Sequence, residues 1–354
     1  MAATIQGFGS MTKGGAGQPV YRVTNLKDSG TGSLRDAVSK GYRYVVFDVA
    51  GEINLSQDIW VKGSYITIDG TTAPAPGITL KDRALLIHGS KGAHDVIVRG
   101  LRSRQSTGCD SCSSTGVGIG IGTEAYNVVL DQVSIQGFDD QAISVDKGAR
   151  DITIQWSLFA EGKNPSHNLP VLIAGTSKTT GAQTRRVSFH HNLVVKGYER
   201  MPYVSLSSTG ERATELQLDM RNNVIWDWVS MGTQVWRGAM ANVINNYYYD
   251  PDAGDRAKHL AIYFCKAAAT LYQCDGSDPR AYARAYIAGN VSGHGAGISA
   301  YLNGLGTEAS PFPGAAVATT DACTAARQVV AQAGVRPLDG VDRKYLSMVK
   351  LVGC

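Results

Sequence analysis

The chain has little charge and no long apolar run. Only 18% of its 354 residues are charged, and the formal net charge is +4. This composition argues against a protein that binds nucleic acid through a massed basic surface. No apolar stretch reaches the length of a membrane-spanning helix. We therefore expect a monomer with neither nucleic acid nor a membrane as its partner, although a local basic groove for an acidic polymer stays compatible with this composition.

The cysteines lack the two CxxC pairs of a structural zinc site. They fall in three local groups, and we expect pairing within each group, although other connectivities are open: Cys109 with Cys112, Cys265 with Cys274, and Cys323 with Cys354. The CxxC at Cys109 is compatible with a redox motif, but no βαβ pattern surrounds it, which favours a loop staple. Paired cysteines suit an oxidising compartment. Because the start, MAA, looks like an initiator placed before a mature terminus, we predict a secreted protein whose signal peptide is absent from this sequence.

Short segments of alternating apolar residues recur along the chain and run into polar or glycine turns. They are YITIDG (65–70), DVIVRG (95–100), NVVLDQ (127–132), DITIQW (151–156), RVSFHHN (186–192), LDMRNN (218–223), NVINNY (242–247) and AYIAGN (285–290). The shortest steps, from 127 to 151 and from 218 to 242, are both 24 residues. A repeat of this length is typical of a solenoid whose longer steps carry inserted loops. The sequence thus predicts an all-β fold, a β-solenoid.

Asparagine recurs at the ends of these segments, at Asn192, Asn222, Asn223, Asn245, Asn246 and Asn290. The similar phase favours a ladder of stacked amides over a plain turn preference. Residues 31–38 look like a short helix in which Ser33 accepts a hydrogen bond from the backbone near Asp36. Residues 320–333 have helical spacing and are expected to cap the last rungs or to pack beside them.

Several motifs in one order resemble the pectate lyases. They are residues 7–30, 32–38 (GSLRDAV), 44–51 (YVVFDVAG), 65–70, 95–102 and, above all, 187–202 (VSFHHNLVVKGYERMP). The resemblance runs to about residue 228 and implies a right-handed parallel β-helix with an N-terminal capping helix. We accordingly expect one domain over residues 1–354, with the cap and first rung in 1–50, rungs with inserted loops in 60–300, and a C-terminal extension packed on the helix in 301–354.

The resemblance also implies an acidic pocket. VVLDQVSIQGFDDQAISV (128–145) aligns with a family pattern VxxDHxSxSWxxDExxS, which places Asp131 and Asp140 at acidic positions, with Asp139 as an extra carboxylate. Together these three could hold one Ca²⁺, which prefers oxygen ligands. The alternative is that they only shape a turn. The family histidine, Ser-Trp and glutamate are here Gln132, Gln136-Gly137 and Gln141.

Basic residues are expected opposite this pocket. The resemblance assigns proton abstraction to Arg200. The family has a second arginine three residues later, and this position is Tyr203 here. The resemblance also assigns Lys163 or His167 to the substrate carboxylate. A guanidinium is a poor base unless its pKa is depressed, so Tyr203 is a second candidate for base or acid. Arg102 and Arg104 share a strand face and, like Gln141, are candidates for binding more distant sugars. The alternative for the arginines is ordinary surface pairing.

The resemblance implies β-elimination on a uronate polymer, most simply polygalacturonate, with a 4,5-unsaturated product. The altered pocket leaves another uronate polymer or a bacterial polysaccharide open as the substrate. Two other readings are a β-helix glycosidase that uses paired aspartates and a noncatalytic β-helix that binds carbohydrate. His190 and His191 stay outside the catalytic set, because successive strand residues point to opposite faces.

Overall fold

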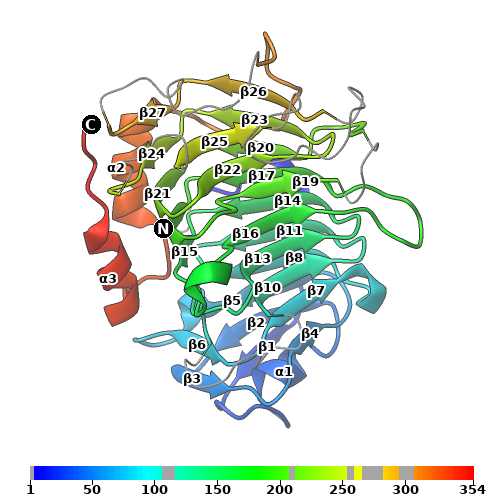
Figure 1. Ribbon diagram of the computed structural model, residues 1–354. Helices are drawn as coiled ribbons and strands as arrows, with labels where there is room; N and C mark the ends of the chain where they lie inside the picture. Colours follow the sequence, from blue (N-terminus) through cyan, green and yellow to red (C-terminus); the bar gives the residue numbers. More distant parts are fainter. Residues whose placement is uncertain (1–3, 106–115, 207–211, 253–258, 265–281, 295–306) are drawn as a thin grey trace.

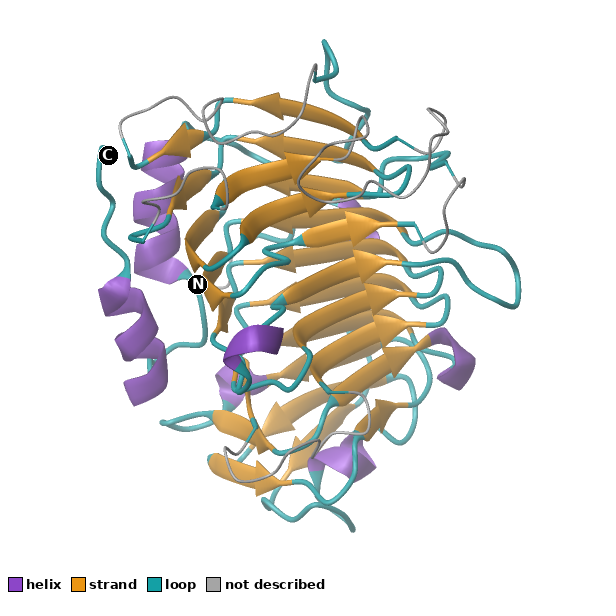
Figure 2. Ribbon diagram, in the orientation of Figure 1, coloured by secondary structure: helices purple, strands orange, loops and turns teal. Residues whose placement is uncertain are grey.

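Three parallel sheets wind around a common interior and form a β-helix (Figures 1 and 2). The computed structural model describes residues 4–105, 116–206, 212–252, 259–264, 282–294 and 307–354. Every pairing between its named strands is parallel, and each strand pairs with the equivalent strand of the next rung. The predicted right-handed parallel β-helix is confirmed. None of the helices in the described part combines the length and the apolar character that a bilayer crossing requires.

The first sheet, sheet A, contains the segments that the sequence singled out. Its strands are β1 (Val20–Val23), β2 (Arg43–Phe47), β5 (Ile66–Asp69), β8 (His94–Arg99), β11 (Tyr126–Asp131), β14 (Arg150–Gln155), β17 (Arg185–His190), β20 (Leu218–Arg221), β23 (Met240–Ile244) and β26 (Arg284–Ala288). The eight predicted segments are successive strands from β5 to β26. The register is 24 residues from Tyr126 to Arg150. Leu218, however, lies opposite Ala241, one residue earlier than the repeat suggested.

The other two sheets complete each rung. Sheet B contains β3 (Gly51–Asn54), β6 (Ile78–Lys81), β9 (Leu101–Arg104), β12 (Ser134–Gln136), β15 (Leu158–Ala160), β18 (Leu193–Gly197), β21 (Val224–Trp228), β24 (Tyr247–Tyr249) and β27 (Val291–Ser292). Sheet C contains β4 (Ile59–Val61), β7 (Leu85–His88), β10 (Val117–Gly122), β13 (Gln141–Asp146), β16 (Val171–Ala174), β19 (Tyr203–Ser205), β22 (Met231–Val235) and β25 (Leu260–Phe264). The inward side chains form one apolar core, in which like positions stack from rung to rung, such as Val98, Leu130, Ile154 and Phe189.

The turn from sheet A to sheet B explains the asparagines. The residue after the strand takes a left-handed conformation, with φ of 54° at His191, 54° at Asn222 and 53° at Asn245. The following residue then points inward. Asn192, Asn223, Asn246 and Asn290 form the predicted amide ladder. From Asn223 onward, each Oδ1 accepts from the backbone N–H and the side-chain amide of the asparagine before it. The ladder satisfies buried backbone groups that the sharp turn would otherwise leave unpaired.

The N-terminal segment lies across the outer face of sheet A. Its backbone N–H groups donate to hydroxyls on that face, Gly15 to Thr67, Gly9 to Thr153 and Phe8 to Ser188. Glycine is required because a Cβ on Gly15 would lie 2.1 Å from the Arg43 carbonyl oxygen. The predicted capping helix is α1 (Leu34–Ala37), where Ser33 accepts from the Asp36 N–H and the apolar side buries Leu34 in the core. Short 3₁₀ turns occur at η1 (Phe8–Met11), η2 (Gly70–Thr72), η3 (Gly89–Lys91) and η4 (Pro165–His167).

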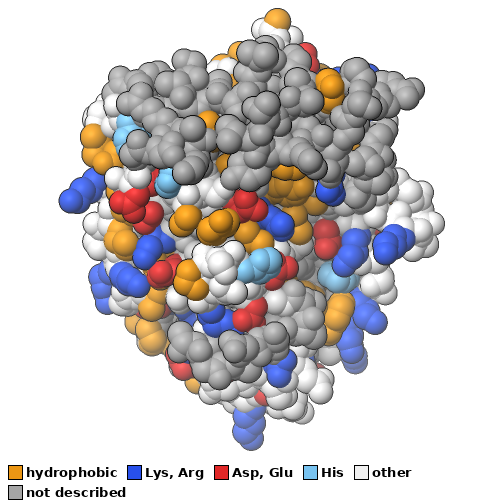
Figure 3. Space-filling view, viewed as in Figure 1, with side chains coloured by type: hydrophobic (Ala, Val, Ile, Leu, Met, Phe, Trp, Pro, Cys, Tyr) orange, Lys and Arg blue, Asp and Glu red, His pale blue; other side chains and the backbone are white. Residues whose placement is uncertain are grey.

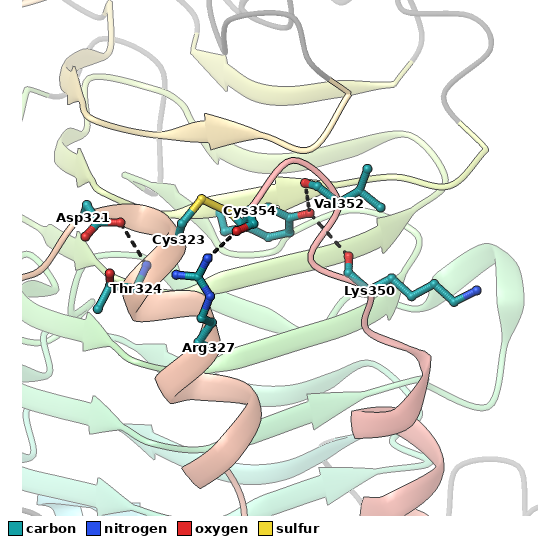
Figure 4. Close-up of a disulfide and its surroundings, with 8 residues drawn as sticks. Asp321, Cys323, Thr324, Arg327, Lys350, Val352 and Cys354 are labelled. Carbon is teal, nitrogen blue, oxygen red and sulfur yellow. Dashed lines mark hydrogen bonds between the residues drawn. A yellow bond between two sulfur atoms is a disulfide. The ribbon is translucent and has the colours of Figure 1, made fainter.

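Two C-terminal helices, α2 (Ala322–Gln332) and α3 (Gly340–Met348), cover the outer face of sheet B (Figure 1). Ala326, Val329 and Tyr345 pack on a patch of that face that includes Leu193 and Trp226. The predicted Cys323–Cys354 disulfide joins the start of α2 to the last residue, beside the Asp321 N-cap (Figure 4). The pairs predicted for Cys109 with Cys112 and for Cys265 with Cys274 lie outside the described residues.

Candidate active site

The turns that lead into sheet C bring most of the predicted site residues together. Asp139 and Asp140 come directly before β13, and Arg200 comes shortly before β19. Lys163 and His167 lie on the segment between β15 and β16. The Ile143 N–H donates to the Pro170 carbonyl and the Val171 N–H to the Arg200 carbonyl, so the three turns are stacked on successive rungs. Figure 3 views the molecule from the side of sheet C, where acidic, basic and histidine side chains gather near the middle.

Each carboxylate of the pair at 139 and 140 already has a basic side chain as its partner. Lys163 Nζ lies 2.5 Å from Asp139 Oδ1, and these side chains are only 9% and 18% exposed. His167 Nε2 lies 2.9 Å from Asp140 Oδ1, with 53% of the histidine side chain exposed. The Gln141 amide also donates to Asp140 Oδ1. Gln141 is therefore a buried residue that orients Asp140, and it reaches substrate only where it lines the hollow described below.

Arg200 lies above an aromatic ring at the end of this row. Its guanidinium carbon is 5.2 Å from the centre of the Tyr203 ring, and its φ of 62° is left-handed, which turns the backbone sharply before β19. Glu199 Oε1 is 3.8 Å from Arg200 Nε, and Gln234 donates to the other oxygen of Glu199 at 3.3 Å. Among the described residues, Arg200 Nε has no hydrogen-bond partner. The arginine is thus held by stacking and by a weak charge contact, and it keeps donors available.

A hollow of about 280 Å³ lies beside these residues on the outer face of sheet C. Gly120 and Ser144 form its shallow floor, between Leu86 and Leu172 on the flanking rungs. A Cβ on Gly120 would lie 2.9 Å from Leu86 Cδ2, so the glycine keeps the floor low. Asp140 lies at one end and Lys147 at the other. The hollow is wide enough for a sugar ring to lie next to Asp140.

Asp131 does not belong to this site, so the predicted three-carboxylate pocket is wrong on this point. It is the last residue of β11 in sheet A, it is fully buried, and it accepts a hydrogen bond from Gln155 at 3.1 Å. Burial raises its pKa. The sequence alignment placed it correctly along the chain, but a rung has three sides, and position 131 is on a different side from position 140.

Arg102 and Arg104 also lie elsewhere, on the outer face of sheet B beneath α3. Arg102 is 1% exposed, and its Nε lies 2.9 Å from Asp342 Oδ2. Arg104 Nη2 lies 2.7 Å from Asp342 Oδ1. They do share a strand face, as predicted, but the C-terminal helix covers that face. A polysaccharide on sheet C cannot reach them.

The residues that the structure describes at this site do not by themselves fit the calcium ion that the resemblance implies. Asp131 is on another sheet, and Asp139 and Asp140 are engaged by Lys163 and His167. On the rung before Asp140 the stacked residue is Gly116, which offers no side-chain oxygen. Among the described residues, no group of three or more histidine, cysteine, aspartate or glutamate side chains is arranged to hold a metal ion. We therefore derive no catalytic step through calcium.

Three neighbours of the site were not predicted from the sequence: Gln234, Ser144 and Leu172. Glu199 and Gln234 come together only through the register of β19 and β22. One signal was present in the sequence, because the run VGIGIG (117–122) alternates glycine with large apolar residues. Two of its glycines, at 120 and 122, leave the outer face of β10 low.

The sequence and the fold were compared with known proteins. No protein-family model matches the sequence. The chain is 35% identical over 243 residues to a "Probable pectate lyase C" of Emericella nidulans, covering 69% of this chain and 51% of that protein. It is 36% identical over 247 residues to the protein of the same name from Neosartorya fischeri, covering 69% and 52%. The chain thus spans about half the length of the curated relatives that it matches.

Solved structures share the fold along nearly the whole chain. The cedar pollen allergen jun a 1 superposes with a TM-score of 0.68 at 20% identity, covering 94% of this chain and 92% of the allergen. A Bacillus pectate lyase in complex with trigalacturonate superposes with a TM-score of 0.65 at 18% identity, covering 94% and 98%. The architecture shows that this chain has the right-handed parallel β-helix fold of these proteins, and about two thirds of its sequence is similar to proteins named as pectate lyases.

Proposed function

We propose that the chain is a polysaccharide lyase that cleaves polygalacturonate by β-elimination. The observation that carries the proposal is the position of Arg200, above Tyr203, on the same sheet face as the hollow that ends at Asp140. The names of the curated relatives support the same substrate. Another uronate polymer would meet the same chemistry, because the reaction requires only a carboxylate next to the carbon that loses its proton.

The reaction moves one proton and breaks one bond. A base takes the proton from C5, the electron pair left behind forms the C4–C5 double bond, and the bond from C4 to the glycosidic oxygen breaks. The leaving oxygen then takes up a proton. The difficult step is the first, because the developing anion is adjacent to a carboxylate and must be stabilised by nearby positive charge.

We assign proton abstraction to Arg200. A guanidinium is ordinarily protonated throughout the usual pH range, so proton abstraction by Arg200 requires alkaline conditions, under which solvent hydroxide takes the guanidinium proton first. Tyr203 lies directly beneath and is the second candidate, either as base or as the acid that protonates the leaving oxygen. His167 is half exposed and Lys163 largely buried. We assign both to the substrate carboxylate, with His167 in direct contact and Lys163 offsetting the charge of Asp139.

Calcium would have to compete with Lys163 and His167 for the carboxylates of Asp139 and Asp140. The ion could be held by Asp139 and Asp140 only if Lys163 and His167 released them, and two carboxylates without a third acidic ligand imply weak binding. We propose that Gln141 contributes indirectly, by fixing the orientation of Asp140. Titration calorimetry with calcium, on the wild type and on a Lys163→Gln variant, measures whether the pair at 139 and 140 becomes available when the lysine charge is removed.

Ultraviolet absorbance tests the reaction, because the product double bond is conjugated with the carboxylate. We expect absorbance to rise on polygalacturonate, and Arg200→Ala to abolish the rise while oligogalacturonate binding persists. Arg22→Ala is the matched control, because Arg22 is an exposed arginine paired with Asp48, far along the chain from the site. No absorbance rise on any uronate polymer, with or without calcium, would refute the proposal. The same assay separates the lyase from a glycosidase, whose product has no double bond.

The paired-aspartate glycosidase is not favoured by this geometry. Asp139 and Asp140 are adjacent and each already contacts a basic side chain, whereas a glycosidase needs two carboxyl groups on opposite sides of the bond that breaks. We further propose that the protein acts as a secreted monomer. The Cys323–Cys354 disulfide supports an oxidising compartment.

A further inference from the structure

The outward residues of sheet C form a continuous column that extends well beyond the candidate active site. Strand register places Trp60, Leu86, Gly120, Ser144, Leu172 and Tyr203 on successive rungs. Five rung spacings of about 4.8 Å separate the first from the last, which gives a column of roughly 24 Å. Aromatic rings mark its two ends, and the hollow beside Asp140 lies between them.

The far end of this column adjoins a second hollow, of about 790 Å³. Trp60 lines it together with Lys62 and Arg83. The indole is only partly buried, against Ala84, Leu86 and Val117, and its ring is fixed by an edge contact with His88 at 4.9 Å between centroids. Lys91 Nζ lies 5.7 Å from the ring centre. An aromatic ring held in this way, next to several cations, has the chemistry that recognises an acidic sugar.

Several charged side chains around this second hollow already have partners and are therefore less available to bind a ligand. Arg35 is occupied, because it donates to the Asp58 carbonyl and pairs with Asp28. The acidic wall is also engaged, since Asp36 accepts from the Tyr21 hydroxyl at 2.5 Å and Asp58 from the Ala84 N–H at 2.9 Å.

Lys62 and Arg83 are the two available cations. Neither forms an ion pair with any residue in the described part of the chain. Lys62 is exposed, and the Nε of Arg83 is buried with no hydrogen-bond partner among the described residues. These two cations can therefore meet a ligand carboxylate without first breaking a pair.

We propose that Trp60, Lys62 and Arg83 form a distal subsite for a uronic acid of the same polymer chain that reacts beside Arg200. One sugar packs its apolar face on Trp60, and its carboxylate meets Lys62 and Arg83. A 1,4-linked pyranose, built from bonds of about 1.5 Å, advances the chain by roughly 5 Å. A trisaccharide bound at Arg200 therefore falls short of Trp60, whereas a heptasaccharide reaches it. This inference rests on the proposed function for the direction of the polymer, but its binding test does not require turnover.

The test compares trigalacturonate with heptagalacturonate, by titration calorimetry and by turnover. We expect Trp60→Ala to weaken heptamer binding by roughly tenfold, the effect of about 1.4 kcal/mol of stacking and burial, with little change for the trimer. Lys62 is exposed, so Lys62→Gln leaves the packing intact. We expect this variant to weaken heptamer binding with little change for the trimer, and to do so more strongly at low salt. Thermal unfolding confirms that both variants are folded.

Matched controls are Tyr42→Ala, an aromatic that is 57% exposed at the start of sheet A, and Lys27→Gln, an exposed lysine of the N-terminal region. Both should leave the ratio of heptamer to trimer affinity unchanged. The inference is overturned if Trp60→Ala and Lys62→Gln also leave that ratio unchanged, or weaken both oligomers equally. If Trp60→Ala weakens heptamer binding but the wild type forms no unsaturated product, the proposed lyase activity is refuted and the proposed subsite is retained.

Discussion

The His190–His191 pair makes the fold sensitive to acid. His190 is the last residue of β17 and His191 occupies the left-handed turn that follows, and their Nδ1 atoms lie 2.9 Å apart. Burial, together with the neighbouring ring, lowers the pKa of His190 to about 3, and burial lowers that of His191 to about 4. An unfolded histidine has a pKa near 6.5. Both rings are therefore neutral in the folded protein under conditions where the unfolded chain is protonated.

The sign and size of the effect follow from this difference. Stability is fully present above pH 6.5 and is lost as the pH falls, because protons bind the unfolded chain first. The slope for each group is half its full value at pH 6.5 and approaches about 1.4 kcal/mol per pH unit at lower pH. Two groups together should remove about 3 kcal/mol between pH 6.5 and pH 5, and the loss should continue toward the folded-state values.

Urea unfolding followed by tryptophan fluorescence, at several pH values, measures this slope. We expect a double variant, His190→Gln with His191→Gln, to be less stable at neutral pH but to lose much less stability on acidification. The reasoning is refuted if the wild type and the double variant have parallel pH profiles, or if NMR shows both buried rings titrating near pH 6.5.

Three further changes test the supports of the site. Asn223→Ala removes the acceptor for the Asn192 N–H and the donor to the Phe189 carbonyl, both buried, and should lower the free energy of unfolding by about 3 kcal/mol in urea melts; a loss as small as that of an exposed asparagine would contradict the ladder's role. Asp342→Ala leaves Asp339 as the one carboxylate beside Arg102 and Arg104 among the described residues and should cost about 3 kcal/mol, whereas Asp48→Ala, at an exposed pair, should cost less than about 1 kcal/mol. Because burial raises the pKa of Asp131, ionising it costs stability as the pH rises above 3.8. Asp131→Asn should therefore gain stability relative to wild type as the pH rises above 3.8, and it should leave calcium binding unchanged. A large loss of calcium binding would return Asp131 to the site.

The predictable parts of the fold were those that each rung repeats. Sheet A strands were visible because apolar residues alternate and end at asparagine or glycine. The same repeat predicted a ladder among six asparagines, and the structure shows that Asn222 and Asn245 instead occupy the left-handed turns beside the four that form it. The alternating pattern did not predict the strands of sheets B and C. Many are only three to five residues long, and insertions of variable length precede them, so no fixed period marks their positions.

The site was predicted in part for the same reason. Arg200, Tyr203, Asp139, Asp140, Lys163 and His167 come from turns that enter one sheet, and motif order located them. Asp131 was misplaced because nine residues along a rung are enough to pass from one sheet to another. Arg102 and Arg104 have the alternation of groove residues, but nothing local in the sequence shows that a helix more than 230 residues later covers them.

The sequence by itself determined that this chain is a β-solenoid of the pectate lyase type with an arginine at a tight corner. Those features depend on local alternation, turn chemistry and motif order, which are readable within one or two rungs. Only the tertiary structure decided which charges meet. It paired Lys163 with Asp139 and His167 with Asp140, it buried Arg102 under α3, and it aligned Trp60 with Tyr203 along one face. Such contacts depend on the register between rungs, and the register is set by how the stacked apolar residues pack in the shared core.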